Sequence, residues 1–288
     1  MHDYGHFDAG ALAASPVFDG RSHGYRTAEL VNRATGSVHT GLGVSELAPG
    51  GSIQPHVHAF EKGFYLLSGE AVLEIGGSAY GLWAGDYGAI KVGTPHAWRA
   101  TGSVPARWLQ MAAPQPKPHG AERDTFFVGG AWTVDRVTTL APGSGGALLG
   151  HFDVSQIPPP AERQTAAPGL EGVFLKWLVD EAFGAAHHRL LFIEYQPGVG
   201  IGLHDHTFEE AYFILSGEVE ATLDGRTYRA GPGDVLWTGV GCVHAFRNAG
   251  VQPVRWLETF APQPPRENVF RFMAEWDRKS RELERGLS

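Results

Sequence analysis

The sequence predicts an all-β protein made of two tandem copies of one strand-rich module, followed by a helix at the C-terminus. The chain repeats itself: HVHAFEKGFYLLSGE at 56–70 matches HDHTFEEAYFILSGE at 204–218, so each position recurs 148 residues later. The 39 glycines and 19 prolines among 288 residues favour short strands joined by many turns. Several segments alternate apolar and polar residues, which is the pattern of strands with one face in a core.

The repeat extends over most of the chain. Paired positions 148 residues apart include Gly85 and Gly233, Asp86 and Asp234, His96 and His244, and Trp108 and Trp256. The short sequence GHFD at 5–8 recurs at 150–153. A repeat of this length indicates a duplicated structural unit. We therefore predict an N-terminal module at 1–118, a linker with one or two strands at 119–148, a C-terminal module at 149–266 and a helix at 267–288.

Each module contains hairpin signals. In the second module, apolar residues of the segment 219–223 alternate with Glu220 and Thr222. Asp224 and Gly225 follow, and this dipeptide tolerates the positive φ angles of a tight hairpin turn. Strands repeated at such short intervals predict an antiparallel sandwich or barrel.

Two further elements are expected outside the modules. The segment TFFVGGAWTVDRV at 125–137 predicts one or two extra strands in the linker. The C-terminal segment is expected to be an amphipathic helix, because its large apolar residues fall at helical spacing, namely Val269, Phe270, Met273 and Trp276.

Composition and charge exclude several classes of protein. The formal charge of −8 argues against binding nucleic acid through its phosphates. No run approaches the roughly 20 apolar residues of a membrane span, and the acidic N-terminus does not resemble a signal peptide. A single cysteine, Cys242, excludes an internal disulfide framework, so we expect a soluble cytoplasmic protein.

Arg107 and Arg255, which correspond across the repeat, are expected to be solvated rather than to bind an anion.

The strongest chemical signal lies in the second module. His204 and His206 are two residues apart, so on a strand they project to the same side. Glu210 follows after a turn, and His244 comes from another strand. Three imidazoles and one carboxylate that converge in this way suit a divalent cation such as Fe, Mn, Ni, Co or Zn. The alternative is that they are three core histidines and a surface glutamate.

The sequence resembles the cupin family. The first cupin motif, G-x5-H-x-H-x3-E-x6-G, is matched by Gly198, His204, His206, Glu210 and Gly217. The second motif, G-x5-P-x-G-x2-H-x3-N, is matched by Gly233, Gly241, His244 and Asn248, with Gly239 in place of the proline. The resemblance covers both modules and implies two jelly-roll barrels, a bicupin. It also implies that one divalent transition metal is held by His204, His206, Glu210 and His244.

The first module departs from the motif. His56, His58 and His96 match its histidines and form a second candidate site, but the position of the glutamate is Lys62. An ammonium beside three imidazoles would repel a second cation, by several kcal/mol at short range in a partly buried site. Glu61 is not expected to compensate, because neighbouring residues on a strand face opposite ways. We therefore expect this module to be mainly structural.

A substrate pocket can be inferred from strand parity. Tyr212 and Ile214 share a face with Glu210, and Phe246 shares a face with His244. Together they would form an apolar, partly aromatic wall in which the Tyr212 phenol acts as a proton or hydrogen-bond donor. The alternative, that they are ordinary core residues, remains open.

Three functions are compatible with this site. The first is a dioxygenase that acts with O2 on a small oxygenated or aromatic metabolite chelated to the metal. The second is a non-oxidative metal-dependent hydrolase, isomerase or lyase. The third is a non-catalytic cupin that binds a sugar or another small ligand. We expect a small-molecule substrate, no nucleic acid or membrane partner, and a homodimer.

Overall fold

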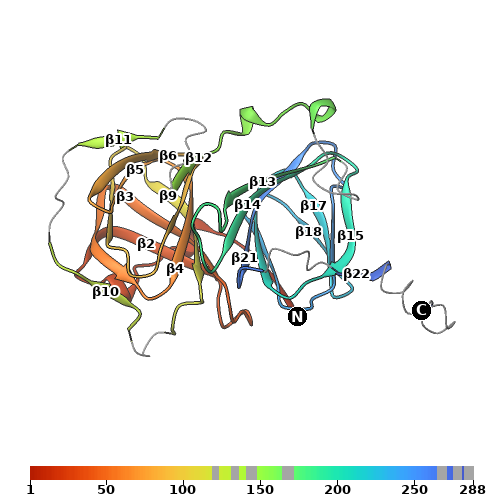
Figure 1. The fold of residues 1–288 in the computed structure, drawn as a ribbon, viewed down its shortest axis with the longest axis horizontal. Coiled ribbons are helices and arrows are strands. Elements are labelled where there is room, and N and C mark those ends of the chain that lie inside the picture. Colours follow the sequence, from red (N-terminus) through yellow and green to blue (C-terminus); the bar gives the residue numbers. More distant parts are fainter. Residues whose placement is uncertain are drawn as a thin grey trace. The chain divides into compact units, whose positions relative to one another are not determined.

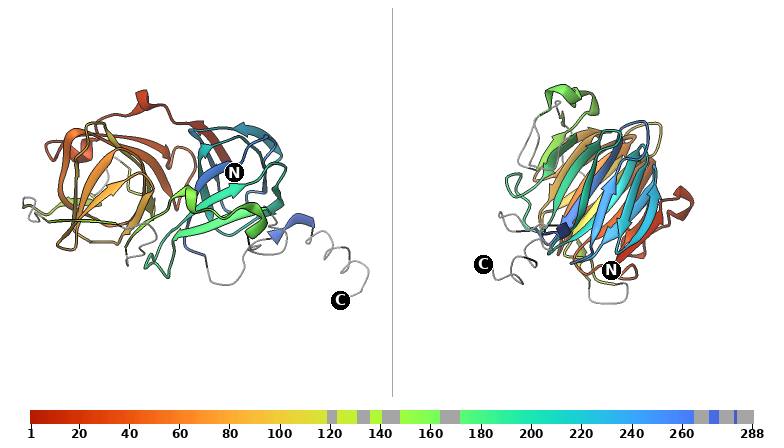
Figure 2. Two further views of the ribbon diagram at one scale, coloured as in Figure 1. Left: turned by 90° about the horizontal axis from the view of Figure 1, so that it is seen from above. Right: turned by 90° about the vertical axis from the view of Figure 1, so that its right-hand side faces the viewer.

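The computed structural model describes residues 1–118, 123–130, 136–140, 148–163, 172–264, 271–274 and 281. Its chain is rich in strands and divides into two compact units (Figure 1). The N-terminal barrel comprises Phe7–Ile157 and Trp177–Leu190, and the C-terminal barrel comprises Met1–His6, Pro158–Lys176 and Leu191–Ser288. The strands of each unit curl into a barrel (Figure 2), which confirms the predicted all-β class. The module boundaries at 118, 148 and 266 remain a sequence-based prediction.

The N-terminal barrel is built on one long strand, β3, with a core of large side chains that includes Leu47, Leu66, Trp98 and Trp108. Its sheet order is β11-β6-β5-β8-β3-β9-β4-β7-β12, and β2 and β10 also pair with β3. The strands are β2 Ser22–Val31, β3 Gly41–His58, β4 Glu61–Ser68, β5 Glu70–Ile75, β6 Ser78–Trp83, β7 Asp86–Ile90, β8 His96–Ala100, β9 Ala106–Ala113, β10 Thr125–Phe127, β11 Val137–Thr139 and β12 Leu149–His151. Short 3-10 turns lie at Ala9–Ala11, Pro16–Phe18 and Val154–Gln156.

The C-terminal barrel consists of two sheets around a core that includes Leu191, Ile214, Leu236 and Trp256. The orders are β1-β19-β16-β21-β14-β13 and β18-β17-β20-β15-β22. The strands are β1 His2–His6, β13 Val173–Val179, β14 Arg189–Tyr195, β15 Gly200–Asp205, β16 Glu209–Ser216, β17 Val219–Leu223, β18 Arg226–Ala230, β19 Asp234–Thr238, β20 His244–Arg247, β21 Val254–Ala261 and β22 Arg271–Phe272, with a 3-10 turn at Pro160–Glu162.

The sequence repeat is reproduced in the strand register. In the N-terminal barrel β3 pairs with β8 so that His56 lies opposite His96. In the C-terminal barrel β15 pairs with β20 so that His204 lies opposite His244. Both pairings contain a register shift just before the first histidine. The repeat therefore places corresponding histidines face to face in each barrel.

The predicted hairpin turn is also present. Leu223 pairs with Arg226, and the two residues between them, Asp224 and Gly225, have φ angles of 45° and 79°. This left-handed conformation is the one that a two-residue hairpin requires, and the sequence Asp-Gly accommodates it.

The strands that carry the repeated GHFD sequence are exchanged. Strand β1, from the first copy, pairs with β19 in the C-terminal barrel. Strand β12, from the second copy, pairs with β7 in the N-terminal barrel. Each brings a histidine to an aspartate at the start of its partner strand: the Nδ1–Oδ1 distance is 2.7 Å for both His6–Asp234 and His151–Asp86. Each barrel is thus completed by a strand from the other copy.

The elements outside the modules agree only in part with prediction. The linker contains two strands, β10 and β11, which pair with β3 and β6 of the N-terminal barrel. The predicted C-terminal helix is wrong at Arg271–Phe272, because these residues form β22 and pair with β15. Met273 has helical geometry, whereas Val269, Phe270 and Trp276 lie outside the described residues.

In the part of the chain that is described, no helix is long and apolar enough to cross a membrane.

Glu61 fixes the segment 186–188 onto the N-terminal barrel. Its carboxylate accepts hydrogen bonds from the backbone N–H groups of Ala186, His187 and His188, and it lies 2.7 Å from His188 Nδ1. Burial opposes its ionisation, but His188 and the backbone donors outweigh burial and lower the pKa of Glu61 to about 2. Glu61 and Lys62 have different partners, as expected for neighbouring residues of a strand. Glu61 accepts hydrogen bonds from residues 186–188, whereas Lys62 donates to Gln110.

We predict that Glu61→Gln lowers the free energy of unfolding by about 3 kcal/mol at neutral pH, since each pKa unit corresponds to about 1.4 kcal/mol. A lowered folded-state pKa stabilises the protein above the ordinary value near 4.5, and this stabilisation is lost as the pH falls toward about 2. Urea unfolding of both proteins across this range measures the difference, which should shrink toward acid pH. Exposed Glu70→Gln is the control and should change little. A pH-independent difference would contradict the assignment.

Candidate metal centre

The four predicted ligands of the C-terminal barrel come together at one end of its interior. His204 lies on β15, His206 directly follows that strand, Glu210 lies on β16 and His244 lies on β20. All four side chains are buried. One ring nitrogen from each histidine lies within 4.8 Å of those of the other two. The three could together hold a divalent metal ion.

Backbone carbonyls orient all three imidazoles. His204 Nδ1 donates to Gly202 O (2.8 Å), His206 Nδ1 donates to Phe208 O (2.8 Å), and His244 Nδ1 donates to Cys242 O (2.9 Å). A carbonyl can only accept, so the proton must be on Nδ1 in each ring. This leaves the lone pair of each Nε2 for a ligand, which is the arrangement that metal-binding histidines require.

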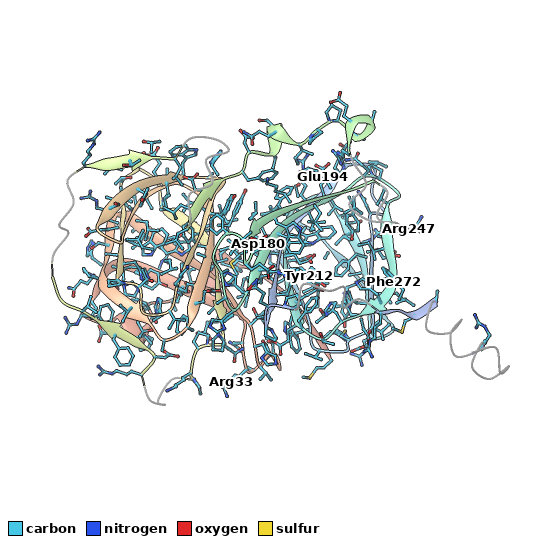
Figure 3. The ribbon with its side chains drawn as sticks, viewed as in Figure 1. Arg33, Asp180, Glu194, Tyr212, Arg247 and Phe272 are labelled. Atoms are coloured by element: carbon cyan, nitrogen blue, oxygen red, sulfur yellow. The ribbon has the colours of Figure 1, made fainter. Side chains whose placement is uncertain are left out.

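Glu210 and Tyr212 complete the cluster. Glu210 Oε2 lies 2.7 Å from His206 Nε2 and 3.3 Å from His244 Nε2. The Tyr212 hydroxyl donates to Glu210 Oε2 and lies 3.4 Å from His244 Nε2. Figure 3 shows Tyr212 among the strands of the C-terminal barrel. The structure therefore groups the residues that the sequence proposed as ligands with the proposed proton donor.

The charges of the site suit a cation. Burial and the neighbouring His244 lower the pKa of His204 to about 4, so its ring is neutral near pH 7. Burial opposes ionisation of Glu210, but His206 and His244 hold its pKa well below the ordinary value. Burial also acts against protonation of His206, yet the charge of Glu210 and its hydrogen bond raise the pKa of this imidazole. A bound divalent cation would take the place of the proton that His206 and Glu210 attract.

A half-buried carboxyl group that sequence reasoning missed lies beside this cluster. Glu258 on β21 lies opposite Tyr212 in the register with β16, and its Oε2 accepts a hydrogen bond from Trp256 Nε1 (3.0 Å). Burial, followed by the charge of Glu210, raises the pKa of Glu258 well above the ordinary value. The signal was a glutamate between Trp256 and Phe260, which share its face of the strand VRWLETFA.

The predicted pocket residues lie in the barrel core. The Phe246 ring is 4.6 Å from Tyr212 and 5.9 Å from His244, measured between centroids. Ile214 is fully buried and belongs to the same hydrophobic cluster. Phe272 of β22, which sequence reasoning also missed, lies 5.5 Å from the His204 ring, measured between centroids. The contacts give an aromatic wall near the histidines, while its role toward a substrate stays a prediction.

The three histidines of the N-terminal barrel have a similar arrangement. One ring nitrogen from each of His56, His58 and His96 lies within 4.8 Å of those of the other two. His56 Nδ1 donates to the Gln54 carbonyl (2.8 Å) and His96 Nδ1 to the Thr94 carbonyl (3.0 Å), whereas His58 Nδ1 bonds to the Thr125 hydroxyl (3.0 Å). Burial lowers the pKa of all three, that of His56 to about 4.

The two barrels differ at the position of the fourth predicted metal ligand, the glutamate. Lys62 stands where the second barrel has Glu210, and its Nζ donates to Gln110 Oε1 (2.8 Å). Burial lowers the pKa of Lys62 to about 8, so the side chain is still mostly cationic at neutral pH. The N-terminal cluster thus combines three neutral imidazoles with an ammonium instead of a carboxylate.

The expectation that Arg107 and Arg255 are solvated is wrong, because each pairs with a buried glutamate. Arg107 Nη2 lies 2.5 Å from Glu46 Oε2, and Arg255 Nε lies 2.6 Å from Glu194 Oε2. These corresponding pairs follow the repeat and satisfy carboxylates on β3 and β14.

Two segments of the chain, residues 43–111 and 191–260, match the family model described as Cupin domain. The chain belongs to the cupin family. One match lies in each barrel, so this cupin is a two-barrel protein, as its sequence motifs implied.

Several known proteins are similar to this cupin in sequence or in fold. The tetracenomycin polyketide synthase protein TcmJ of Streptomyces glaucescens is 32% identical over 120 residues, which are 41% of this chain and 80% of TcmJ. Oxalate decarboxylase of Lactobacillus farciminis, solved as a formate complex, is similar in fold with a TM-score of 0.64 and 17% identity, over 96% of this chain and 90% of that one. Oxalate decarboxylase of Bacillus subtilis, a protein with Mn(II) centres, is similar in fold with a TM-score of 0.60 and 17% identity. The match covers 88% of this chain and 76% of that one.

We predict that Lys62→Glu raises the metal content by up to one equivalent per chain, because it replaces a repelling ammonium with a carboxylate beside three neutral imidazoles. Elemental analysis after loading with Mn(II) and dialysis measures the change. Exposed Lys91→Glu, which makes the same change of charge, should leave the content unaltered. An unchanged content in Lys62→Glu would show that repulsion by Lys62 is not what limits metal binding in this barrel.

Proposed function

We propose that this cupin is a metal-dependent enzyme that holds one divalent transition metal in its C-terminal barrel through His204, His206, Glu210 and His244. The observation that carries the proposal is the orientation of the three imidazoles. Their Nδ1–H groups are all engaged by backbone carbonyls, and one ring nitrogen from each lies within 4.8 Å of the others. A carboxylate with a lowered pKa adjoins two of these rings.

Three nitrogen donors and one oxygen donor suit Fe, Mn, Ni or Zn. The Mn(II) centres of the Bacillus subtilis oxalate decarboxylase, which shares the fold, support Mn among these. When bound, such an ion would act as a Lewis acid toward substrate oxygen atoms, and iron could in addition exchange electrons with O2.

Residues beside the ligands would orient the substrate and hold protons. Burial and the charge of Glu210 raise the pKa of Tyr212 well above its ordinary value, so its hydroxyl keeps its proton. That hydroxyl lies between Glu210 and His244, where it can donate to an oxygen atom of a bound molecule. Phe246 packs against Tyr212 and helps to exclude water from this position.

For the reaction, we favour a dioxygenase that acts on a small oxygenated or aromatic metabolite. The aromatic side chains Tyr212, Phe246 and Phe272 around the histidines support an aromatic substrate. The similarity to a polyketide synthase protein supports the same class of substrate.

A second candidate is non-oxidative chemistry, such as that of a lyase, hydrolase or isomerase. The Tyr212 hydroxyl and the Glu258 carboxyl group, whose pKa values are both raised, lie in the same region, and proton transfer alone would suffice for such reactions. The shared fold of the oxalate decarboxylases supports this candidate as well. A cupin that only binds a sugar or other small ligand is the third candidate.

We predict that the reaction with an oxygenated aromatic substrate requires O2. Oxygen-electrode traces with Fe(II)-loaded protein and a panel of diketones, phenols and hydroxy acids should show O2 uptake equal to substrate consumed. Product formation at an unchanged rate under argon would remove the dioxygenase and leave the non-oxidative candidate. Protein that binds panel members without converting them under either gas would support the third.

We also predict that His206→Ala leaves less than about a tenth of an equivalent of metal per chain, because one of three imidazole ligands is lost. The corresponding His58→Ala, in the N-terminal barrel, should retain most of the metal. Elemental analysis of both purified variants beside the wild type provides the comparison. Equal losses in the two variants would contradict the placement of the metal in the C-terminal barrel alone.

A further inference from the structure

The N-terminal barrel contains a cavity of about 360 Å³ whose lining includes His58, one of its three histidines. Most of its lining is apolar, with contributions from Phe18, Val31, Leu42, Phe60 and Met111. This volume falls within the range of pockets that hold small organic ligands, about 300–1,000 Å³. The cavity therefore has the size and surface of a binding site rather than of a packing defect.

Lys62 and Gln110 are two of the polar residues of this cavity, whose lining also includes Glu29, Asn32, Arg33, Gln115, Lys117 and Asp124. Both line it, and both also line a much smaller pocket that includes His56 and His96. The Lys62 ammonium donates to Gln110 Oε1, and Gln110 Nε2 in turn donates to Thr27 Oγ1 (3.2 Å). A hydrogen-bonded chain thus fixes the ammonium at the boundary between the cavity and the histidines.

No carboxylate among the described residues forms an ion pair with Lys62. Asp124 is near enough to favour its charged form, but Asp124 Oδ2 accepts a hydrogen bond from the backbone N–H of Lys117 (2.6 Å). A half-buried ammonium with a single neutral acceptor is incompletely compensated for the water it has lost. A carboxylate supplied by a ligand would offset this loss.

His58 adds a second polar atom without a partner. It is 3% exposed and lines the cavity. Its Nδ1 is bonded to Thr125, while its Nε2 has no hydrogen-bond partner in the described part of the chain. A buried polar atom of this kind normally finds a partner, and a ligand oxygen could provide one.

We propose that the N-terminal barrel binds a small amphipathic monocarboxylate, whose carboxylate pairs with the Lys62 ammonium and whose apolar body fills the cavity. His58 Nε2 and Gln110 are the further polar groups that the carboxylate end would meet. This site is distinct from the metal centre of the C-terminal barrel and does not depend on metal there. It assigns a binding role to the barrel in which the metal motif lacks its glutamate.

The test uses 2-naphthoate, which joins a carboxylate to an apolar aromatic body, and 2-naphthamide as its neutral counterpart. Isothermal titration of the full-length protein near pH 7 should give a dissociation constant at least about tenfold lower for the acid, because only the acid can pair with the ammonium. Equal affinity for acid and amide, or no binding of either, would overturn the proposal.

Variants locate the site. Lys62→Met removes the charge and keeps an apolar chain, so the preference for the acid should fall to within about threefold, whereas Lys62→Arg should keep it. Lys91→Met, an exposed control, should behave as the wild type. His244→Ala, which removes one of the proposed metal ligands of the other barrel, should also leave binding of 2-naphthoate unchanged. Loss of binding in His244→Ala, or an unchanged preference in a folded Lys62→Met, would overturn the proposal.

Discussion

The hydrogen bonds between histidine Nδ1 atoms and backbone carbonyls determine what this protein can bind. In the C-terminal barrel these bonds fix the tautomer of His204, His206 and His244. Each acceptor carbonyl lies only two residues from its histidine, so the local course of the strands sets the ring orientation. The cluster is preorganised by the backbone rather than by flexible side chains, and ligands held in this way need little rearrangement to bind a cation.

On this shared framework the residue at one position, Lys62 in one barrel and Glu210 in the other, reverses the charge beside the histidines. Glu210 adds a carboxylate with a lowered pKa to one set of imidazoles, while Lys62 adds an ammonium to the other. The first combination attracts a cation and the second repels it, whereas an anion experiences the reverse. A duplicated barrel can therefore carry two binding sites of opposite preference.

Much of this could be predicted from the sequence, because the informative signals are local or repeated. The spacing of His204 and His206 follows from strand parity, and the repeat indicates the corresponding residues of the first barrel. Asp224 and Gly225 specify their own turn. These features depend on a few neighbouring residues or on a comparison of the chain with itself.

Other features depend on long-range pairing, which local patterns do not encode. The exchange of β1 and β12 could not be predicted, since GHFD has the same sequence in both copies and either barrel could accept it. The sequence predicts a helix where β22 lies, because the spacing of its apolar residues carries no information about its partner, β15. Glu258 was missed because only the three-dimensional structure places it beside Tyr212.

Anomalous X-ray diffraction from crystals of the Mn-loaded protein tests the central claim most directly. The account predicts one anomalous peak in the C-terminal barrel, within bonding distance of the Nε2 atoms of His204, His206 and His244 and of a Glu210 carboxylate oxygen, and no peak among the N-terminal histidines. A peak between His56, His58 and His96, or none at either cluster in fully loaded crystals, would contradict it.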